Sequence, residues 1–222
     1  NSTAGYDNIS SIDVNKLCKE LSPILSHLIN TIITKGKFPD AFKFAVVTPI
    51  SKTGKFNDLN DLRPISILST FNKIAEKFLY NRIIKFILKY NLISNNQFGF
   101  RPKSSTETAA TELVSYLRKS LDKKKIASVV FMDIKKAFDL VDRKILIKML
   151  NLIGIRGKVE EILTSYLSQR FQAVKIGSIL SKPLEVIYGV VQGSILGSLL
   201  FNIFFNEITK LEGLSGKMIL YA

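Results

Sequence analysis

One acidic residue follows an apolar run at a place where it could serve catalysis. Asp133 comes directly after the largely apolar residues 127–132, in the segment FMDIKKAFD. A carboxylate beside buried apolar side chains costs free energy unless water or a cation solvates it. The residues alone leave two interpretations open: Asp133 caps the turn that follows, or it binds a metal ion at a catalytic site.

Short apolar runs predict the strands that would position this carboxylate. Residues 127–134 are bounded by polar segments, as in a buried strand that ends at Asp133. Residues 44–50 are rich in β-branched side chains, and 171–176 could pair with 184–187 as a hairpin. A further apolar strand begins at residues 218–221.

Capping residues and helical periodicity predict the remaining elements. Helices are expected over residues 14–34 (restarting at Ser22 and Pro23), 69–90, 104–121, 142–154, 158–167 and 194–208. Ser69 and Asp142 are the expected N-caps of two of these helices, and Ser104 with Glu107 has the spacing of a capping box. The mixed order of helices and strands predicts an α+β fold.

The charge balance indicates a polyanionic partner. The 222 residues contain 32 Lys and Arg against 18 Asp and Glu, which gives a net charge of +14. Residues 35–90 alone carry a net charge of +7. Clustered cations gain free energy by displacing counterions from phosphates, although a solvated basic surface has the same composition.

Several classes of protein are excluded by what the sequence lacks. Cys18 is the only cysteine and His27 the only histidine, so an internal disulfide and a cysteine-rich zinc site are impossible. No apolar run approaches the roughly 20 residues that span a bilayer, and the polar N-terminus is no signal peptide. We therefore expect an intracellular protein, nuclear or cytoplasmic, without a membrane partner. Asn1 is not a methionine, so the chain is expected to begin inside a longer protein.

Four sequence blocks, taken in order, resemble the motifs of reverse transcriptases. They are DLRPISILSTFNKIAEKFLYNRI, NQFGFRPKSSTETA, FMDIKKAFDLVD and GVVQGSILGSLLFNIFFNEI. Together with GKFPDAFKFAVVTPISKTGK they cover most of residues 35–208. Their residue pattern resembles that of the non-LTR retrotransposon branch. A group II intron-like reverse transcriptase or maturase is the alternative within the family. A noncatalytic RNA-binding protein on the same fold is the alternative from another class.

The resemblance implies a right-hand polymerase fold with fingers and most of the palm but no complete thumb. Residues 1–34 are then an N-terminal helical extension, and 35–126 are fingers with a basic face for RNA. Residues 127–153 are palm with the first catalytic motif. Residues 154–190 connect fingers and palm through a hairpin, and 191–222 are palm with the second motif and a truncated third-motif strand.

The implied activity is RNA-directed DNA synthesis. Such enzymes add deoxynucleotides to a primer 3′ end on an RNA template, by phosphoryl transfer with two Mg²⁺ ions. Asp133 and the backbone carbonyl of Ile134 match metal ligands of the family. The other two carboxylates belong to a YxDD turn, whereas the sequence here reads MILYA over residues 218–222 without an Asp-Asp pair. The 222 residues alone are therefore expected not to polymerise.

The same resemblance assigns the nucleotide contacts. Phe138 matches the aromatic gate that excludes a ribose 2′-hydroxyl, and Lys52 and Arg63 match the fingers cations that close on the triphosphate. Gln192 and Gly193 match the motif that touches nucleotide and template.

Other positions carry weaker implications. Arg101 matches an arginine that contacts the template or a fingers acid, with a surface salt bridge as the alternative. Asp139 and Asp142 are expected in turn and cap positions. Val191 and Ser198 stand where the family commonly has proline. An upstream endonuclease domain is a further expected partner.

Overall fold

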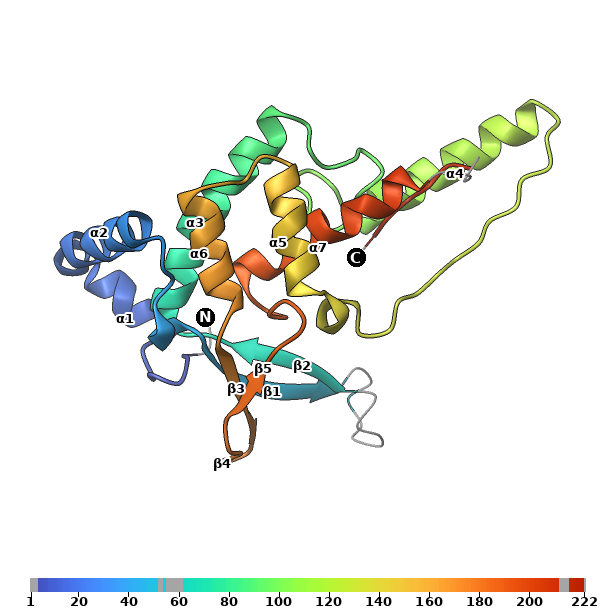
Figure 1. Cartoon of the computed structure of the whole chain (residues 1–222). Helices are drawn as coiled ribbons and strands as arrows, with labels where there is room; N and C mark the ends of the chain where they lie inside the picture. Colours follow the sequence, from blue (N-terminus) through green and yellow to red (C-terminus); the bar gives the residue numbers. More distant parts are fainter. Residues whose placement is uncertain (1–3, 52–53, 55–61, 212–215, 222) are drawn as a thin grey trace.

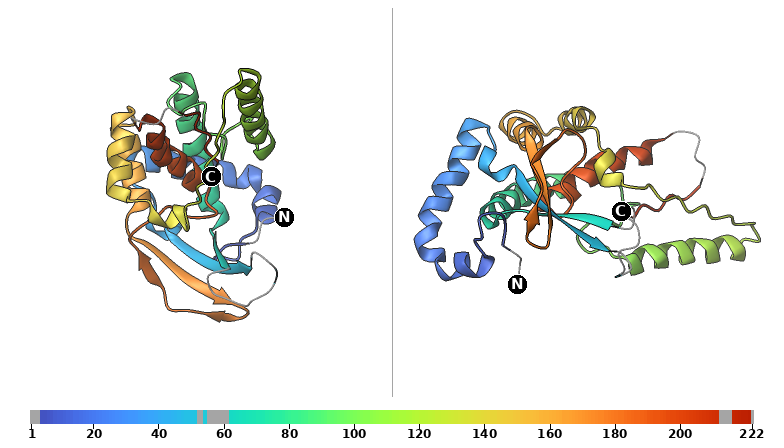
Figure 2. Two further views of the ribbon diagram at one scale, coloured as in Figure 1. Left: turned by 90° about the vertical axis from the view of Figure 1, so that its right-hand side faces the viewer. Right: turned by 90° about the horizontal axis from the view of Figure 1, so that it is seen from below.

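A mixed sheet and a group of helices make up the described molecule, which comprises residues 4–51, 54, 62–211 and 216–221 of a computed structural model. The sheet lies on one side of the helices, and helix α4 projects away from both (Figures 1 and 2). The five strands are β1 (Phe44–Ser51), β2 (Leu62–Ile67), β3 (Arg170–Ile176), β4 (Ile179–Leu180) and β5 (Leu184–Val186). The mixed helix and strand content agrees with the predicted α+β class.

Strand β1 joins parts of the chain that are far apart in sequence. It pairs antiparallel with β2 and parallel with β3, which in turn pairs antiparallel with β4 and β5. The strand over 44–50 and the hairpin between 171–176 and 184–187 are thus confirmed. Strand β2 was not predicted, because Pro64 and its polar neighbours hide the strand pattern of the RPIS segment. Pro64 is tolerated there because β2 lies at the edge of the sheet order β2-β1-β3-β4.

Four helices enclose the main hydrophobic core. They are α3 (Thr70–Lys89), α5 (Arg143–Leu152), α6 (Lys158–Leu167) and α7 (Ile195–Phe205). Their buried side chains include Leu79, Ile83, Leu146, Leu150, Leu163, Leu196 and Leu200. Helix α7 packs against α3 and α5, so its continuous apolar sequence is explained by contacts on several sides. The described residues also form three short 3₁₀ helices: η1 (Asp40–Phe42), η3 (Ala137–Leu140) and η4 (Asn206–Lys210).

The helix boundaries test the capping predictions. Ser69 and Asp142 cap α3 and α5 as predicted, through bonds from the amides of Asn72 and of Lys144 and Ile145. The capping box of α4 (Thr106–Asp122) is formed by Ser105 and Thr108, one residue later than predicted. Adjacent serines both have the right chemistry for a cap, and Ser105 has the extended backbone of an N-cap, with φ of −149° and ψ of 172°.

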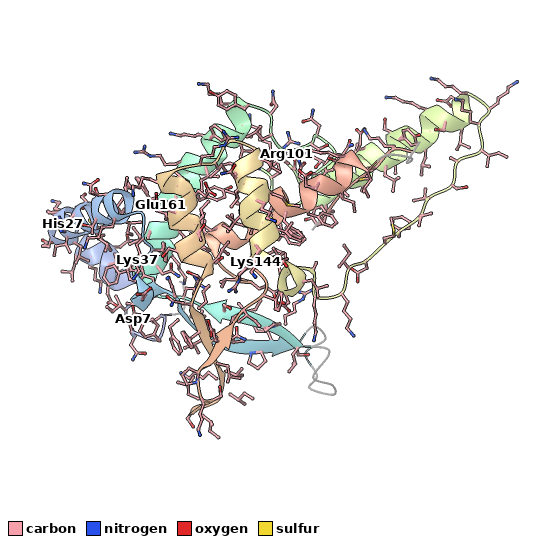
Figure 3. All side chains as sticks on the ribbon, in the orientation of Figure 1. Asp7, His27, Lys37, Arg101, Lys144 and Glu161 are labelled. Carbon is pink, nitrogen blue, oxygen red and sulfur yellow. The ribbon has the colours of Figure 1, made fainter. Side chains whose placement is uncertain are left out.

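The N-terminal helices break at a different residue from the one predicted. α1 (Ser11–Lys16) and α2 (Cys18–Lys35) meet at Leu17, and Pro23 lies inside α2. The predicted restart at Ser22 is therefore wrong, because the Ser22 hydroxyl donates to the carbonyl of Cys18 within the same helix. Gly36 ends α2 in the left-handed conformation, with φ of +67°. His27 is an exposed residue of α2 (Figure 3).

The predicted strand over 127–134 is wrong in the described structure. After α4 the chain runs back to η3 as an extended segment without a strand through residue 136 (Figure 1). Val130, Phe131 and Met132 are 78%, 82% and 85% exposed. A strand needs a hydrogen-bonded neighbour, and the sheet formed by the described residues offers this segment none. The expected strand at 218–221 is reduced to one parallel bridge between Leu220 and Gln97.

Two leucines of α5 test where the core lies. Leu146 is fully buried and Leu152 is 78% exposed on the same helix. We predict that Leu146→Ala lowers the free energy of unfolding by about 2–5 kcal/mol because it removes packed methyl groups and leaves a cavity. Leu152→Ala is the matched control and should stay within about 0.5 kcal/mol of the wild type in urea unfolding. Equal losses for the two variants would contradict this core.

Candidate nucleotide site

The turn that carries Gln192 and Gly193 lies against strand β2. The amide of Ser66 donates to the carbonyl of Gln192 over 3.0 Å. A Cβ added to Gly193 would lie 3.0 Å from the carbonyl oxygen of Ser66, and the φ of Gly193 is +99°. Glycine is therefore required here both by conformation and by the close backbone approach.

Arg63 stands on the same edge strand as Ser66. It pairs with Ile50 in the β1–β2 ladder, and its side chain is exposed. The structure thus brings the predicted triphosphate cation and the predicted nucleotide motif onto adjoining segments. Lys52, the second predicted cation, lies outside the described residues.

Phe138 also contacts the segment that leads into this turn. Its carbonyl accepts a hydrogen bond from the amide of Val190, two residues before Gln192, over 2.9 Å. Its half-buried ring stacks on Phe201 with centroids 4.5 Å apart and meets the edge of Phe100 at 5.7 Å. Residues about fifty positions apart in sequence are thereby brought together, and the ring is fixed between helix α7 and the loop before α4.

Backbone packing at Gly189 explains why these segments stay together. A Cβ at this position would lie 2.8 Å from the Cα of Asp139 and 2.9 Å from the carbonyl oxygen of Phe138. The amide of Gly189 donates to the carbonyl of Val141 over 2.9 Å. The side chain of Asp139 is exposed, yet partial desolvation beside this contact raises the pKa of its carboxyl group above the usual value.

Arg143 is a structural residue of this region that the sequence did not reveal. Its guanidinium donates to the carbonyls of Leu167, Val186, Tyr188 and Gly189. Burial, and then the neighbouring Arg170, lower the pKa of Arg143 to about 10, so the group stays charged at neutral pH. A lone arginine in the first turn of a predicted helix gives no sign of such a role, because solvated arginines are common there.

Arg101 lies in the loop between α3 and α4 (Figure 3). Its guanidinium donates to the carbonyl of Ser94 over 2.9 Å and to the side-chain oxygen of Asn95 over 2.8 Å. These bonds join two parts of the same loop and so stabilise its conformation. The predicted template contact of Arg101 stays a prediction.

Asp133 and Ile134 lie on the extended segment after α4, and both are exposed. Across the described ranges, no group of three or more His, Cys, Asp and Glu side chains is arranged to hold a metal ion. Asp142 is a helix cap, as predicted. The described residues around Asp133 therefore do not fit a magnesium site by themselves.

The sequence that carries these segments matches a known protein family. The family model described as reverse transcriptase (RNA-dependent DNA polymerase) matches residues 50–222, and the chain belongs to this family. The chain is 31% identical over 189 residues to the probable RNA-directed DNA polymerase from transposon BS of Drosophila melanogaster. It is 28% identical over 201 residues to that from transposon X-element of the same organism.

These matches cover most of the chain and a small part of each relative. The BS and X-element alignments span 85% and 86% of the chain but 21% of either relative. A third match, the Pol polyprotein from the type-1 element R2 of Popillia japonica, is 24% identical over 65% of the chain and 20% of its own length. The chain thus spans about a fifth of the length of these curated relatives. Among the helices that the structure describes, none is long and apolar enough to cross a membrane.

Two glycines with positive φ distinguish the cost of backbone conformation from the cost of close packing. Gly189 has a φ of +78° and would clash with backbone atoms, whereas Gly177 has a φ of +59° and nothing within 4 Å. We predict that Gly189→Ala lowers the free energy of unfolding by about 1–3 kcal/mol more than Gly177→Ala does, because only the first variant overpacks. Urea unfolding of both variants measures the difference. Equal losses would show that the contact of residues 138–139 with Gly189 is absent in solution.

Proposed function

We propose that this chain is the fingers and palm part of an RNA-directed DNA polymerase that adds deoxynucleotides to a primer 3′ end. The observation that carries the proposal is the convergence of three distant segments. Ser66 and Val190 donate hydrogen bonds to the carbonyls of Gln192 and Phe138, so strand β2, η3 and the 189–193 turn adjoin. In the proposed active state these segments surround the incoming nucleotide.

The nucleotide would be bound by groups of complementary chemistry. Arg63 is exposed and offers a planar set of N–H donors that suits phosphate oxygens. Lys52, which is not among the described residues, would add a second positive charge. Gln192 and Gly193 would contact the base pair, since glycine lets a substrate approach the backbone closely.

Phe138 is the proposed sugar gate. Its ring is fixed between Phe201 and Phe100, so it has little freedom to make room for an added substituent. A rigid aromatic face below the sugar would exclude a 2′-hydroxyl and favour deoxynucleotides.

The RNA template would lie along the basic fingers surface, residues 35–126. Lys77, Arg82 and Lys85 are exposed on helix α3. Cations arranged in this way bind phosphates and release counterions. Arg101 is proposed to support the template-side loop.

Asp133 and the carbonyl of Ile134 stay our proposed magnesium ligands. The described neighbourhood of Asp133 lacks a metal-binding cluster, so further carboxylates are required before this segment can hold the ions. The same observation favours a second candidate function, a noncatalytic RNA-binding protein, over a polymerase acting through these residues alone.

Sugar selection provides a test in a full-length polymerase that carries this segment. We predict that Phe138→Val increases ribonucleotide incorporation relative to deoxynucleotide incorporation by about tenfold or more, because the barrier to the 2′-hydroxyl is removed. Primer extension on an RNA template with each nucleotide type measures the ratio. Phe86→Val is the matched control, since Phe86 is also half-buried and contacts another ring, that of Tyr90.

An unchanged ratio in Phe138→Val would remove Phe138 from the sugar site. Wild-type polymerase that binds RNA without extending any primer would favour the noncatalytic alternative.

Charge reversal tests the RNA surface in the 222-residue chain itself. We predict that Lys77→Glu with Lys85→Glu weakens binding to primed RNA by about tenfold or more at 0.1 M salt, because two phosphate contacts become repulsive. Lys175→Glu with Lys182→Glu makes the same charge change on exposed residues of the β3–β4 region and should weaken binding less. Equal losses would mean that only net charge matters.

A further inference from the structure

A carboxylate in the protein interior contacts the first turn of helix α7. Glu76 of α3 is fully buried, and its Oε2 accepts hydrogen bonds from the amides of Ile195 and Leu196 at 2.7 and 3.3 Å. Amides in the first turn of a helix have no partner within the helix, and negative charge is favourable there. Glu76 therefore fixes where α7 begins.

Two hydroxyl groups extend this contact to the turn before α7. Tyr166 of α6 donates to Oε1 of Glu76 over 3.0 Å, and its hydroxyl lies 3.1 Å from that of Ser194. Ser194 accepts from the amide of Gly197 and donates to the carbonyl of Val191 at 2.8 and 3.0 Å. A continuous set of polar contacts thus leads from Glu76 to Val191, the residue directly before Gln192.

The turn is consequently held from two sides. Strand β2 binds the carbonyl of Gln192 through the amide of Ser66, and the polar contacts from Glu76 and Tyr166 reach Val191. The peptide groups on both sides of Gln192 are therefore bonded to different parts of the fold.

Stability alone does not account for a carboxylate at this depth. Burial raises the pKa of Glu76, and the positive charge of Arg170 opposes the rise. Arg170 is itself buried and lies over the ring of Tyr166, with 4.7 Å between guanidinium carbon and ring centroid. Replacement of buried charged networks by apolar side chains is often neutral or stabilising. A buried network of this kind is therefore weak evidence for a role in stability, which leaves the geometry of the turn as the role to test.

We propose that Glu76 is a positioning residue for nucleotide addition, acting with Tyr166 and Ser194 to fix the 191–193 turn that presents Gln192 to the nucleotide. The inference rests on the proposed polymerase function. Glu76 touches no substrate, and its effect reaches the nucleotide only through the turn.

Three variants separate positioning from packing. Glu76→Ala removes the acceptors of both helix amides and of Tyr166. Glu76→Gln keeps an oxygen for the α7 amides and presents an NH₂ group to Tyr166, whose hydroxyl then donates to Ser194. Leu79→Ala is the matched control, because Leu79 is a buried residue of the same helix that belongs to the apolar core.

The first measurement is primer extension on RNA by a full-length polymerase that carries this segment. We expect Glu76→Ala to raise the KM for deoxynucleotide by about tenfold, as for the loss of one capping interaction. Glu76→Gln should restore the KM to within about twofold of wild type. Leu79→Ala should lower the melting temperature while the KM stays unchanged. A KM that rises equally in Glu76→Ala and Leu79→Ala, or in neither, would overturn the proposal.

The second measurement is amide hydrogen exchange in the 222-residue chain, and it needs no activity. The amide of Ser66, bonded to Gln192, should exchange faster in Glu76→Ala relative to the slowest core amides, and should not do so in Leu79→Ala. An unchanged Ser66 amide in Glu76→Ala would overturn the proposed control of the turn. Absence of extension by the wild-type polymerase would instead refute the proposed function, and the positioning role with it.

Discussion

The candidate site depends on one constraint, the close approach of a glycine-containing turn to the backbone of two other segments. At Gly189 the turn lies against residues 138–139, and at Gly193 it lies against Ser66. A side chain at either glycine would separate the segments by the width of a methyl group. The motifs converge because nothing but backbone lies between them, and hydrogen bonds from Ser66 and Val190 then fix the register.

The elements that sequence predicted well are those whose stability is local. Helices α3 and α5 begin at the expected caps, and α6 covers the expected residues 158–167. The β3–β5 hairpin also follows from short-range patterning. Strand β2 was missed because Pro64 and its polar neighbours hide the strand pattern, and the pairing with β1 that stabilises it is not visible in the sequence. The predicted strand at 127–134 failed for the converse reason, since apolar composition favours burial but the described sheet gives that segment no neighbour.

Site residues also divide into those that sequence patterns reveal and those that only tertiary contacts reveal. Motif resemblance selected Arg63, Phe138 and Gln192 as nucleotide contacts, and their roles stay proposals. It gave no account of Glu76 and Arg143, whose contacts are made with segments 24 to 120 residues away. A glutamate or an arginine in an amphipathic helix resembles a solvated residue until tertiary structure shows what surrounds it. Residues that position a site are therefore harder to predict than residues that touch a substrate.

The central claim is that β2, η3 and the 189–193 turn form a deoxynucleotide site. Photo-crosslinking tests it most directly, with a full-length polymerase that carries this segment, a primed RNA and a deoxynucleoside triphosphate bearing a photoreactive group. Peptide mapping should place the crosslinks within residues 62–67, 137–140 and 189–194, and unlabelled deoxynucleotide should abolish them. Crosslinks confined to other surfaces, or unaffected by competing nucleotide, would contradict the account.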